Sequence, residues 1–417
     1  MRFGVFYELQ LPKPWNEGDE HKLFREALEQ VVLADQLGID YAWEVEHHFL
    51  EEYSHSSAPE VFLAAAAAKT KNIRLGHGIR QVIAAYNHPA RTAETIATLD
   101  LISDGRVDFG IGEGATRLEL GGFGIPAKHK RDMSLEAAEQ IANMMVMQPY
   151  PGFEGKSFSM PCRNVLPKPL QKPHPPMWMA CTNRDTIRVA ARNGLGALAF
   201  SFVNPAEAKT WSEIYYEIIK SDECVPLGHS VNPNIAVVSA FSVHEDREEA
   251  IRRGQEGFEF FGYALQALVA RDTKPGYSNL WKQFSIDREK SKRAQVSVED
   301  PAEFNRAAGI GTPDDLVTHL SDLQSSGVDQ VILMQQAGRN RNDHICEGLE
   351  LFANAVLPKL ASGREEREAR KMAELAPYIA AALERKVRMP TLDEEETPIV
   401  RASAERAQVN QGSTEAG

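Results

Sequence analysis

Short runs of apolar residues alternate with longer amphipathic segments along most of the chain. The first four runs start at residues 2, 40, 73 and 107, at intervals of 38, 33 and 34 residues. This spacing fits one strand, one helix and two short loops, which together form the repeating unit of a parallel sheet. Between the first two runs, Leu23, Ala27 and Val31 recur at helical spacing. We expect that helix to be capped by Asp19 and to stop at Gly38.

The same alternation continues to residue 334 and provides eight predicted strands. Eight strand–helix units in roughly 250 residues or more are what a closed (β/α)₈ TIM barrel needs. Two insertions interrupt the rhythm, the proline-rich segment Tyr150–Pro176, expected to hold a hairpin, and the polar segment Arg271–Gly309, expected to form a mobile lid. The predicted strands are Arg2–Tyr7, Asp40–Val45, Ile73–Ile79, Val107–Gly112, Met177–Ala180, Ala197–Ser201, Asn234–Val243 and Gln330–Met334.

The composition changes after Leu360, where a charge run from Arg364 to Lys371 begins a different kind of segment. Beyond it, Ile379, Leu383 and Val387 keep helical spacing, and the last residues have the composition of a disordered chain. We therefore divide the protein into a barrel, residues 1–360, and a C-terminal extension outside the barrel, residues 361–417, which is partly helical and then disordered.

Charge and cysteine content narrow the possible partners. The chain of 417 residues has 46 basic and 59 acidic residues, a net charge of −13, which disfavours nucleic acid and anionic membrane surfaces. No apolar run is long enough to cross a bilayer, and the first residues lack the apolar core of a secretory signal. The four cysteines stand far apart, which disfavours a zinc knuckle or a disulfide framework. These features predict a cytoplasmic protein that acts on a small molecule.

In a barrel of this kind, functional side chains collect where the strands end. The second predicted strand is followed by Glu46, His47, His48 and Phe49. The carboxylate and the imidazoles can transfer protons near neutral pH, and we take Glu46 and His47 as candidate catalytic residues. Because neighbours on extended chain point in opposite directions, the two histidines are not expected to share a metal ion, and His48 is expected to serve packing. Two purely structural histidines are the alternative.

Three further strand ends carry candidate chemistry. His88 follows the third strand and is a third catalytic candidate, although the segment around Pro89 also suits a simple turn that opens a helix. The glycines of Gly110–Gly114 would let a flat or anionic ligand approach the backbone, and a tight turn explains them equally well. After the fifth strand, Thr182, Asn183 and Thr186 open a helix, whose N-terminus could bind phosphate. Ordinary helix capping is the alternative there, and general principles favour it.

Taken together, these segments resemble the bacterial-luciferase-like flavin-dependent monooxygenases. The resemblance covers about Met1 to Leu360, and its most specific parts are EHHF and the string NHPARTAETIATLDLISDGR. Its other parts are RFGVFY at the first strand, LADQLGIDYAWEVEHHF from Leu33 to Phe49, the prolines of Lys172–Pro176, ACTNRDTIRVAARNG from Ala180 to Gly194, and GTPDDLVTHLSDLQSSGVDQVIL from Gly311 to Leu333.

The resemblance implies a TIM barrel that binds reduced FMN at the carboxyl ends of its strands, with the flavin supplied by a separate reductase. Dioxygen would form a flavin 4a-hydroperoxide that oxidises a small organic substrate. His47 falls on the family's catalytic histidine, and Thr182, Asn183 and Thr186 fall near the flavin phosphate. Arg131 aligns with a phosphate-binding arginine, and a non-proline cis peptide is expected at Gly78–Ile79, beneath the flavin. The family also implies a homodimer or homotetramer, for which the helix with the run Ala64–Ala68 would allow close approach.

The chain departs from the luciferases at Gly112 and Glu113, where those enzymes have cysteine and arginine. An acidic residue cannot bind phosphate, so Arg117 or Arg131 would have to compensate, and light emission is not the expected activity. Three rival functions remain: a deazaflavin-dependent dehydrogenase, a non-catalytic flavin-binding protein, and a metal hydrolase on the same barrel. The first strand offers no paired histidines, which disfavours the hydrolase.

Overall fold

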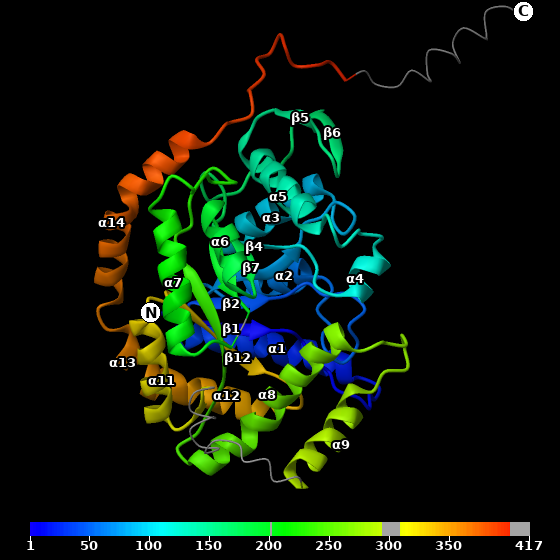
Figure 1. Cartoon of the computed structure of the whole chain (residues 1–417), viewed down its shortest axis with the longest axis vertical. Helices are drawn as coiled ribbons and strands as arrows, with labels where there is room; N and C mark the ends of the chain where they lie inside the picture. The colour runs from blue at the N-terminus through cyan, green and yellow to red at the C-terminus, as the bar shows by residue number, and fades with distance from the viewer. Residues whose placement is uncertain (201, 294–308, 401–417) are drawn as a thin grey trace, which may run out of the picture.

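A computed structural model describes residues 1–200, 202–293 and 309–400. Within these residues, eight parallel strands close into a barrel in the order β1-β12-β9-β8-β7-β4-β3-β2, which confirms the predicted (β/α)₈ architecture (Figure 1). The barrel strands are β1 Arg2–Tyr7, β2 Tyr41–Glu44, β3 Arg74–Gln81, β4 Val107–Gly112, β7 Met177–Cys181, β8 Gly196–Ala199, β9 Ile235–Ala240 and β12 Gln330–Gln336.

Helices surround the barrel. Those that follow the barrel strands are α1 Asp19–Gln36, α2 Pro59–Lys69, α3 Pro89–Ile102, α5 Lys130–Val146, α6 Arg184–Arg192, α7 Pro205–Ile219, α8 Arg247–Ala270 and α12 Asn342–Leu351, and α11 Pro313–Ser325 lies between β9 and β12. The remaining helical segments are α4 Arg117–Gly122, α9 Leu280–Arg293, the π-helical turn η1 Phe352–Val356, α13 Leu357–Ala361 and α14 Arg364–Arg385.

One hydrophobic core lies between the barrel and its helices, and another lies inside the barrel. Successive side chains of a strand point alternately to one core and to the other. Phe3, Val5 and Tyr7 of β1 point outward to the helices, whereas Phe6 points into the barrel. Trp43 fills much of the interior and is fully buried. It fits because Gly76 has no side chain, since a Cβ atom there would lie 2.2 Å from the indole ring. The apolar runs of the sequence are therefore strands buried on both faces, as parallel sheets require.

The first insertion forms the predicted hairpin, in which β5 (Tyr150–Glu154) pairs with β6 (Ser159–Arg163). The predicted strand Asn234–Val243 is broken in two, because β9 ends at Ala240 and the short strand β10 (Ser242–Val243) pairs instead with β11 (Ile310–Gly311). In the second insertion, helix α9 packs against α8, with the rings of Phe260 and Phe284 5.5 Å apart. Part of the predicted lid, residues 294–308, lies outside the described residues.

The C-terminal extension is helical where predicted, but it does not stand away from the barrel. Helix α14 packs along the flank of its own barrel (Figure 1), with Leu375 fully buried in the outer core. Lys371 binds Asp329 at 2.8 Å, and Arg385 donates to the carbonyl oxygen of Cys224. Helix α14 thus lies outside the eight strand–helix units, as expected, but it packs against them, because its apolar face and its cations both have partners on the barrel.

One predicted helix cap is also wrong. Helix α1 begins at Asp19, and the cap position is Gly18, which has a positive φ of 88° and supplies no side-chain hydrogen bond. The Asp19 carboxylate instead accepts a hydrogen bond from the Asn16 amide at 2.7 Å. Gly38 has a φ of 78° just after the helix, as expected for a stop. None of the described helices combines the length and the apolar composition that a bilayer crossing requires.

Candidate active site

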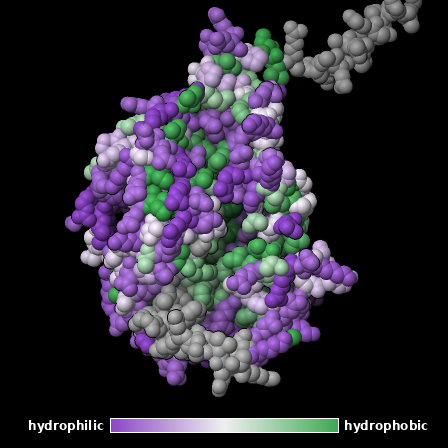
Figure 2. Space-filling view, in the orientation of Figure 1, coloured by the Kyte–Doolittle hydropathy of each residue, from purple (hydrophilic) through white to green (hydrophobic). Residues whose placement is uncertain are grey.

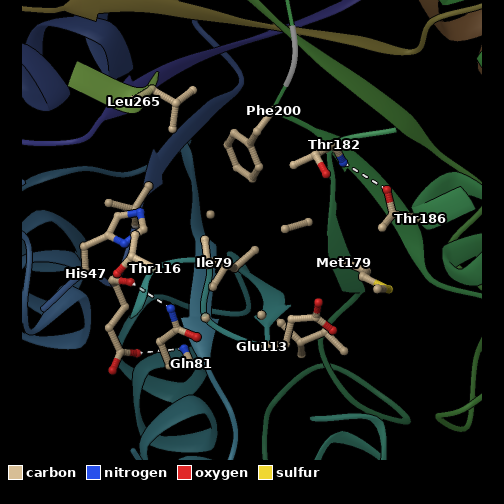
Figure 3. A pocket seen from close by; sticks show the side chains of 18 of the residues that line it. His47, Ile79, Gln81, Glu113, Thr116, Met179, Thr182, Thr186, Phe200 and Leu265 are labelled. Carbon is tan, nitrogen blue, oxygen red and sulfur yellow. Dashed lines mark hydrogen bonds between the residues drawn. The ribbon is translucent and has the colours of Figure 1, made fainter. Parts of the chain in front are cut away.

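A cavity of about 480 Å³ opens at the carboxyl ends of the barrel strands. In the space-filling view, a hollow with hydrophobic residues beside it opens near the middle of the face shown (Figure 2). Apolar side chains line most of the cavity, and two polar groups of residues interrupt them. One contains Glu8, His47 and Tyr53; the other contains Glu113, Lys130, Arg131, Thr182, Asn183 and Thr186. Figure 3 shows that His47 and Thr182 lie on opposite sides of the cavity.

His47 stands between two carboxyl groups. Its Nδ1 atom lies 2.8 Å from Glu119 Oε1, in a hydrogen bond across 72 positions of sequence, and its Nε2 atom lies 3.2 Å from Glu8 Oε1. Glu8 follows β1 and Glu119 belongs to α4, so three different strand ends build this group. Tyr53 packs edge-on against the imidazole ring, with ring centroids 5.7 Å apart. The ring is consequently fixed in orientation and flanked by negative charge.

These neighbours set the protonation of the group. Burial by itself would lower the pKa of His47, but Glu8 and Glu119 raise that pKa to about 9. Burial raises the pKa of the Glu8 carboxyl to about 7, although the charge of His47 opposes the rise. For Glu119, burial is outweighed by its ion pair and hydrogen bond with His47, and its pKa falls below the ordinary value. The expected near-neutral pKa of His47 is therefore wrong, because His47 is a cation at neutral pH.

Glu46 lines the cavity, but its carboxylate is already occupied. It accepts hydrogen bonds from the Gln81 amide at 2.9 Å and from Asn87 Nδ2 at 2.8 Å, and it lies 3.1 Å from His48 Nε2. His48 points away from the cavity and stacks on Tyr86, in agreement with its expected packing role. Among the described residues, no group of three or more His, Cys, Asp or Glu side chains is arranged to hold a metal ion.

His88 is not brought into the cavity. It is exposed at the N-cap of α3, where its Nδ1 atom accepts a hydrogen bond from the Ala90 amide at 3.2 Å. Its ring lies 6.1 Å from that of Phe158 on the β5–β6 hairpin. The alternative interpretation of this segment, a turn that opens a helix with Pro89, describes the structure, because the imidazole satisfies a free N–H group of the first turn.

The peptide bond between Gly78 and Ile79 is cis, as predicted. Both residues line the cavity, and the Ile79 carbonyl accepts a hydrogen bond from the Glu46 amide at 2.9 Å. The Ile79 side chain lies against Gly112, where a Cβ atom would meet Ile79 Cδ1 at 1.9 Å. A larger residue at position 112 would therefore displace the Ile79 side chain, which lines the cavity.

The opposite end of the cavity begins at α6. Thr182, Asn183 and Thr186 all line the cavity, and they also cap the helix. The amides of Thr182 and Asn183 donate to Thr186 Oγ1 at 2.9 and 3.1 Å, and the Asn183 side chain accepts from the Thr186 amide (Figure 3). The capping alternative therefore describes these contacts, and the same residues also line the cavity.

Arg131 lies next to this helix end and is bound by the acidic residue that replaces the luciferase arginine. Its Nε and Nη2 atoms donate to the two Glu113 oxygens, each at 3.1 Å. Lys130 Nζ lies 3.3 Å from the same carboxylate and donates to the Gly114 carbonyl at 2.6 Å. Two cations and one carboxylate therefore face the cavity here, which leaves a net positive charge at this end.

Helix α8 and the segment after β8 form an apolar wall on a third side. Phe261, Leu265 and Leu268 line the cavity, together with Phe202. Val269 also belongs to this wall and is 78% exposed, which is unusual for a valine and marks the wall as reaching the surface.

Sequence reasoning missed Glu8 and Glu119, and a signal existed for each. Glu8 directly follows the first predicted strand, so the rule that pointed to Glu46 and His47 applies to it equally. Glu119 stands three residues after Thr116, which is the spacing of a capping box. Thr116 Oγ1 accepts a hydrogen bond from the Glu119 amide and donates one to the Glu119 carboxylate at 2.9 Å. Nothing in the sequence, however, indicated that this carboxylate reaches His47.

A family model for luciferase-like monooxygenases matches residues 1–330. The chain belongs to the luciferase-like monooxygenase family. Among curated relatives in this family, the oxygenase component of flavin-dependent trigonelline monooxygenase from Acinetobacter baylyi is 32% identical over 201 residues. That alignment covers 46% of this chain and 52% of the relative, so the match spans about half the relative's length.

Solved structures support the same fold. Monooxygenase RslO1 from Streptomyces bottropensis is 26% identical, with a TM-score of 0.69 over 86% of this chain and 99% of its own. The oxygenating constituent of 3,6-diketocamphane monooxygenase from Pseudomonas putida, in complex with FMN, is 21% identical, with a TM-score of 0.66 over 86% and 98%. A coenzyme F420-dependent tetrahydromethanopterin reductase from Methanopyrus kandleri shares the fold too, at 23% identity and a TM-score of 0.59 over 86% and 98%.

Proposed function

We propose that this protein is the oxygenase component of a two-component monooxygenase that uses reduced FMN and dioxygen to oxidise a small, largely apolar organic compound. The observation that carries the proposal is the two-ended cavity, with the His47 group on one side and cations beside a helix N-terminus on the other. Its volume of about 480 Å³ lies within the range of about 300–1,000 Å³ typical of small-molecule sites.

The residues present fit a flavin phosphate and a flat ring system. Arg131 and Lys130 supply positive charge, and the α6 terminus adds the partial positive charge of a helix N-terminus. Ile79, Met179 and Val238 offer an apolar bed between the two polar ends. Reduced FMN, when bound, supplies the two electrons that activate dioxygen. Thr182, Asn183 and Thr186 would hold its phosphate together with Arg131, and Gly78 would lie under the ring.

The roles of the chain's own residues follow from their contacts. His47 is the candidate catalytic residue, and because it is protonated at neutral pH, it acts as a hydrogen-bond or proton donor. Glu46 is a positioning residue, since its carboxylate accepts hydrogen bonds from Gln81 and Asn87 and so connects the end of β2 to the end of β3. The exposed position of His88 removes the basis for a catalytic role, and we do not retain it in the proposal.

The proposal includes partners. A separate reductase would supply the reduced flavin, as the name of the trigonelline relative, an oxygenase component, suggests. We also propose a homodimer or homotetramer, measurable by light scattering. In the run Ala64–Ala68 of α2, Ala66 and Ala67 are buried in the protein's own core, whereas Ala65 and Ala68 are exposed and free to meet a second copy.

The decisive experiment measures oxygen uptake by the full-length protein with reduced FMN across a panel of ketones, aldehydes and terpenoids. We expect one class of substrate to stimulate uptake and to gain one oxygen atom from dioxygen. In parallel, binding of FMN, riboflavin and coenzyme F420 is compared, and FMN should bind more tightly than riboflavin. Tighter binding of F420 with substrate oxidation in the absence of oxygen would instead support the dehydrogenase function. Flavin binding without any turnover would support the binding protein.

A further inference from the structure

A buried carboxyl group faces the cavity directly beside His47. Glu8 follows β1, is only 2% exposed and lines the cavity. Its Oε1 atom lies 3.2 Å from His47 Nε2, but the contact is not aligned as a hydrogen bond, and no described residue hydrogen-bonds to this atom. Buried carboxyl oxygens are almost always hydrogen-bonded in folded proteins. Oε1 has its ion pair with His47 but no hydrogen bond, so it can accept a hydrogen bond from a ligand atom in the cavity.

The two ring nitrogens of His47 contact two different carboxyl groups. Glu119 from α4 binds Nδ1, and the Thr116 hydroxyl holds Glu119 in turn. Nε2 faces Glu8, and the neighbouring Tyr53 hydroxyl lowers the pKa of that carboxyl group. Glu46 is the remaining charged neighbour of the ring. Glu119 thus fixes the orientation of the imidazole, and Glu8 lines the cavity beside it.

The two groups that face the cavity change charge in different ranges of pH. With a pKa of about 9, His47 remains a cation at neutral pH and cannot accept a further proton there. Glu8 has a pKa of about 7, so its carboxyl group exchanges a proton near neutrality. A group that both reaches the cavity and titrates near the working pH is suited to general base catalysis.

We propose that Glu8 is a second catalytic residue, the proton acceptor of the cavity, and that His47 is the paired proton donor. This inference rests on the proposed function. In a monooxygenase reaction, the reduced flavin provides two electrons and two hydrogens, one oxygen atom enters the substrate, and the other leaves as water. The Glu8 carboxylate takes up one proton at Oε1, His47 gives its Nε2 proton to the departing oxygen, and the proton on Glu8 then passes to His47 across the 3.2 Å contact. Both groups therefore end each turnover as they began.

Glu8→Gln tests the proposal, because it keeps the shape of the side chain and removes its charge. In the wild-type enzyme, turnover should rise with pH through about 7, as Glu8 ionises, and fall through about 9, as His47 loses its proton. Glu8→Gln should remove the rising part and lower the maximum at least about tenfold. Glu44→Gln is the matched control, since Glu44 is also buried, with a raised pKa, but does not line the cavity.

A second measurement does not depend on turnover. The titration of His47 is followed by nuclear magnetic resonance in the flavin-free protein with labelled histidine, its signal being identified by its absence in His47→Gln. Glu8→Gln should lower the pKa of His47 by at least about one pH unit, because it removes the negative charge of Glu8, which raises that pKa. The Tyr53 hydroxyl lowers the pKa of Glu8, so Tyr53→Phe should raise that pKa. The rising part of the turnover profile should then move to higher pH.

The outcomes separate this inference from the proposed function. If no substrate stimulates oxygen uptake while the His47 titration responds to Glu8→Gln, the proposed function fails and Glu8 loses its catalytic role, although the coupled pair is real. If turnover is observed and Glu8→Gln keeps the rising part of the profile at full rate, the inference about Glu8 is wrong and the proposed function stands. An unchanged His47 titration in Glu8→Gln would also overturn it.

Discussion

Replacement of His47 by glutamine should abolish most of the turnover without releasing the flavin. The pKa of His47 is raised from 6.5 to about 9, which corresponds to about 3 kcal/mol of interaction, at 1.36 kcal/mol per pH unit, in favour of the imidazolium. Glutamine can still donate to Glu119, but it cannot carry or transfer a proton. Acid–base help of this kind is typically worth roughly a hundred- to ten-thousand-fold in rate, so we expect a decrease of at least about tenfold.

The fold should tolerate this change. Glu119 would keep its hydrogen bonds to the Thr116 hydroxyl at 2.9 Å and to the His48 amide at 3.2 Å, and Glu8 can become neutral through its raised pKa. Because His47 lies across the cavity from Thr182 (Figure 3), the dissociation constant for FMN should change by no more than about twofold, or roughly 0.4 kcal/mol.

Turnover and flavin affinity are therefore measured separately, by oxygen uptake at saturating flavin and by quenching of flavin fluorescence. His48→Gln is the matched control, because His48 is the adjacent histidine but points away from the cavity and should leave turnover close to the wild-type value. Imidazole added to His47→Ala should restore part of the lost rate. Full turnover in His47→Gln, combined with its loss in His48→Gln, would refute the assignment of the catalytic histidine.

Two further predictions concern the cation pair and the C-terminal helix. Glu113→Gln frees Arg131 and Lys130 from their carboxylate partner. The affinity for FMN should therefore rise at least about fivefold, or roughly 1 kcal/mol, while the affinity for riboflavin, which has no phosphate, should change little. Equal changes for both flavins in a binding titration would contradict this. Leu375→Ala should lower the free energy of unfolding by about 2–5 kcal/mol in a urea titration, because Leu375 is fully buried on the inner face of α14. Turnover should stay unchanged, since Leu375 does not line the cavity, and an unaltered midpoint would show that α14 contributes little to stability.

The barrel was predictable because its signal is local and repeated. Each strand is a short apolar run, each helix keeps its own spacing, and the interval between them is constrained by the geometry of the unit. The errors occurred where tertiary contacts decide between locally equivalent choices. The polar side chain of Asp19 could cap a helix, but Asn16 offered it a different partner and Gly18 provided the turn. Likewise, α14 has the composition of a solvated helix, and its place on the barrel depends on tertiary contacts, which are the burial of Leu375 and the positions of Asp329 and Cys224.

The candidate site was predictable in position but not in protonation. The rule that strands end at the active site placed His47, Thr182 and Asn183 around one cavity, as the structure does. The same rule could not tell which of His47 and His88 lines the cavity, since both follow a strand. That depends on which group hydrogen-bonds to each imidazole. His88 meets the free Ala90 amide of its own helix, whereas His47 meets a carboxylate 72 positions away.

The direction of proton transfer depends on residues outside the motif. The same EHHF segment would hold a neutral histidine, able to act as a base, if no carboxylate stood at the ends of β1 and α4. In this protein, Glu8 and Glu119 both face the ring, so the imidazole keeps its proton and the role of base passes to the carboxyl group with the raised pKa. Both pKa values are raised together, so the imidazole stays protonated at the pH where the carboxyl group titrates, and the two groups take the roles of acid and base. A motif therefore locates the chemistry of such a barrel, while the residues that end the other strands decide which group gives the proton and which one receives it.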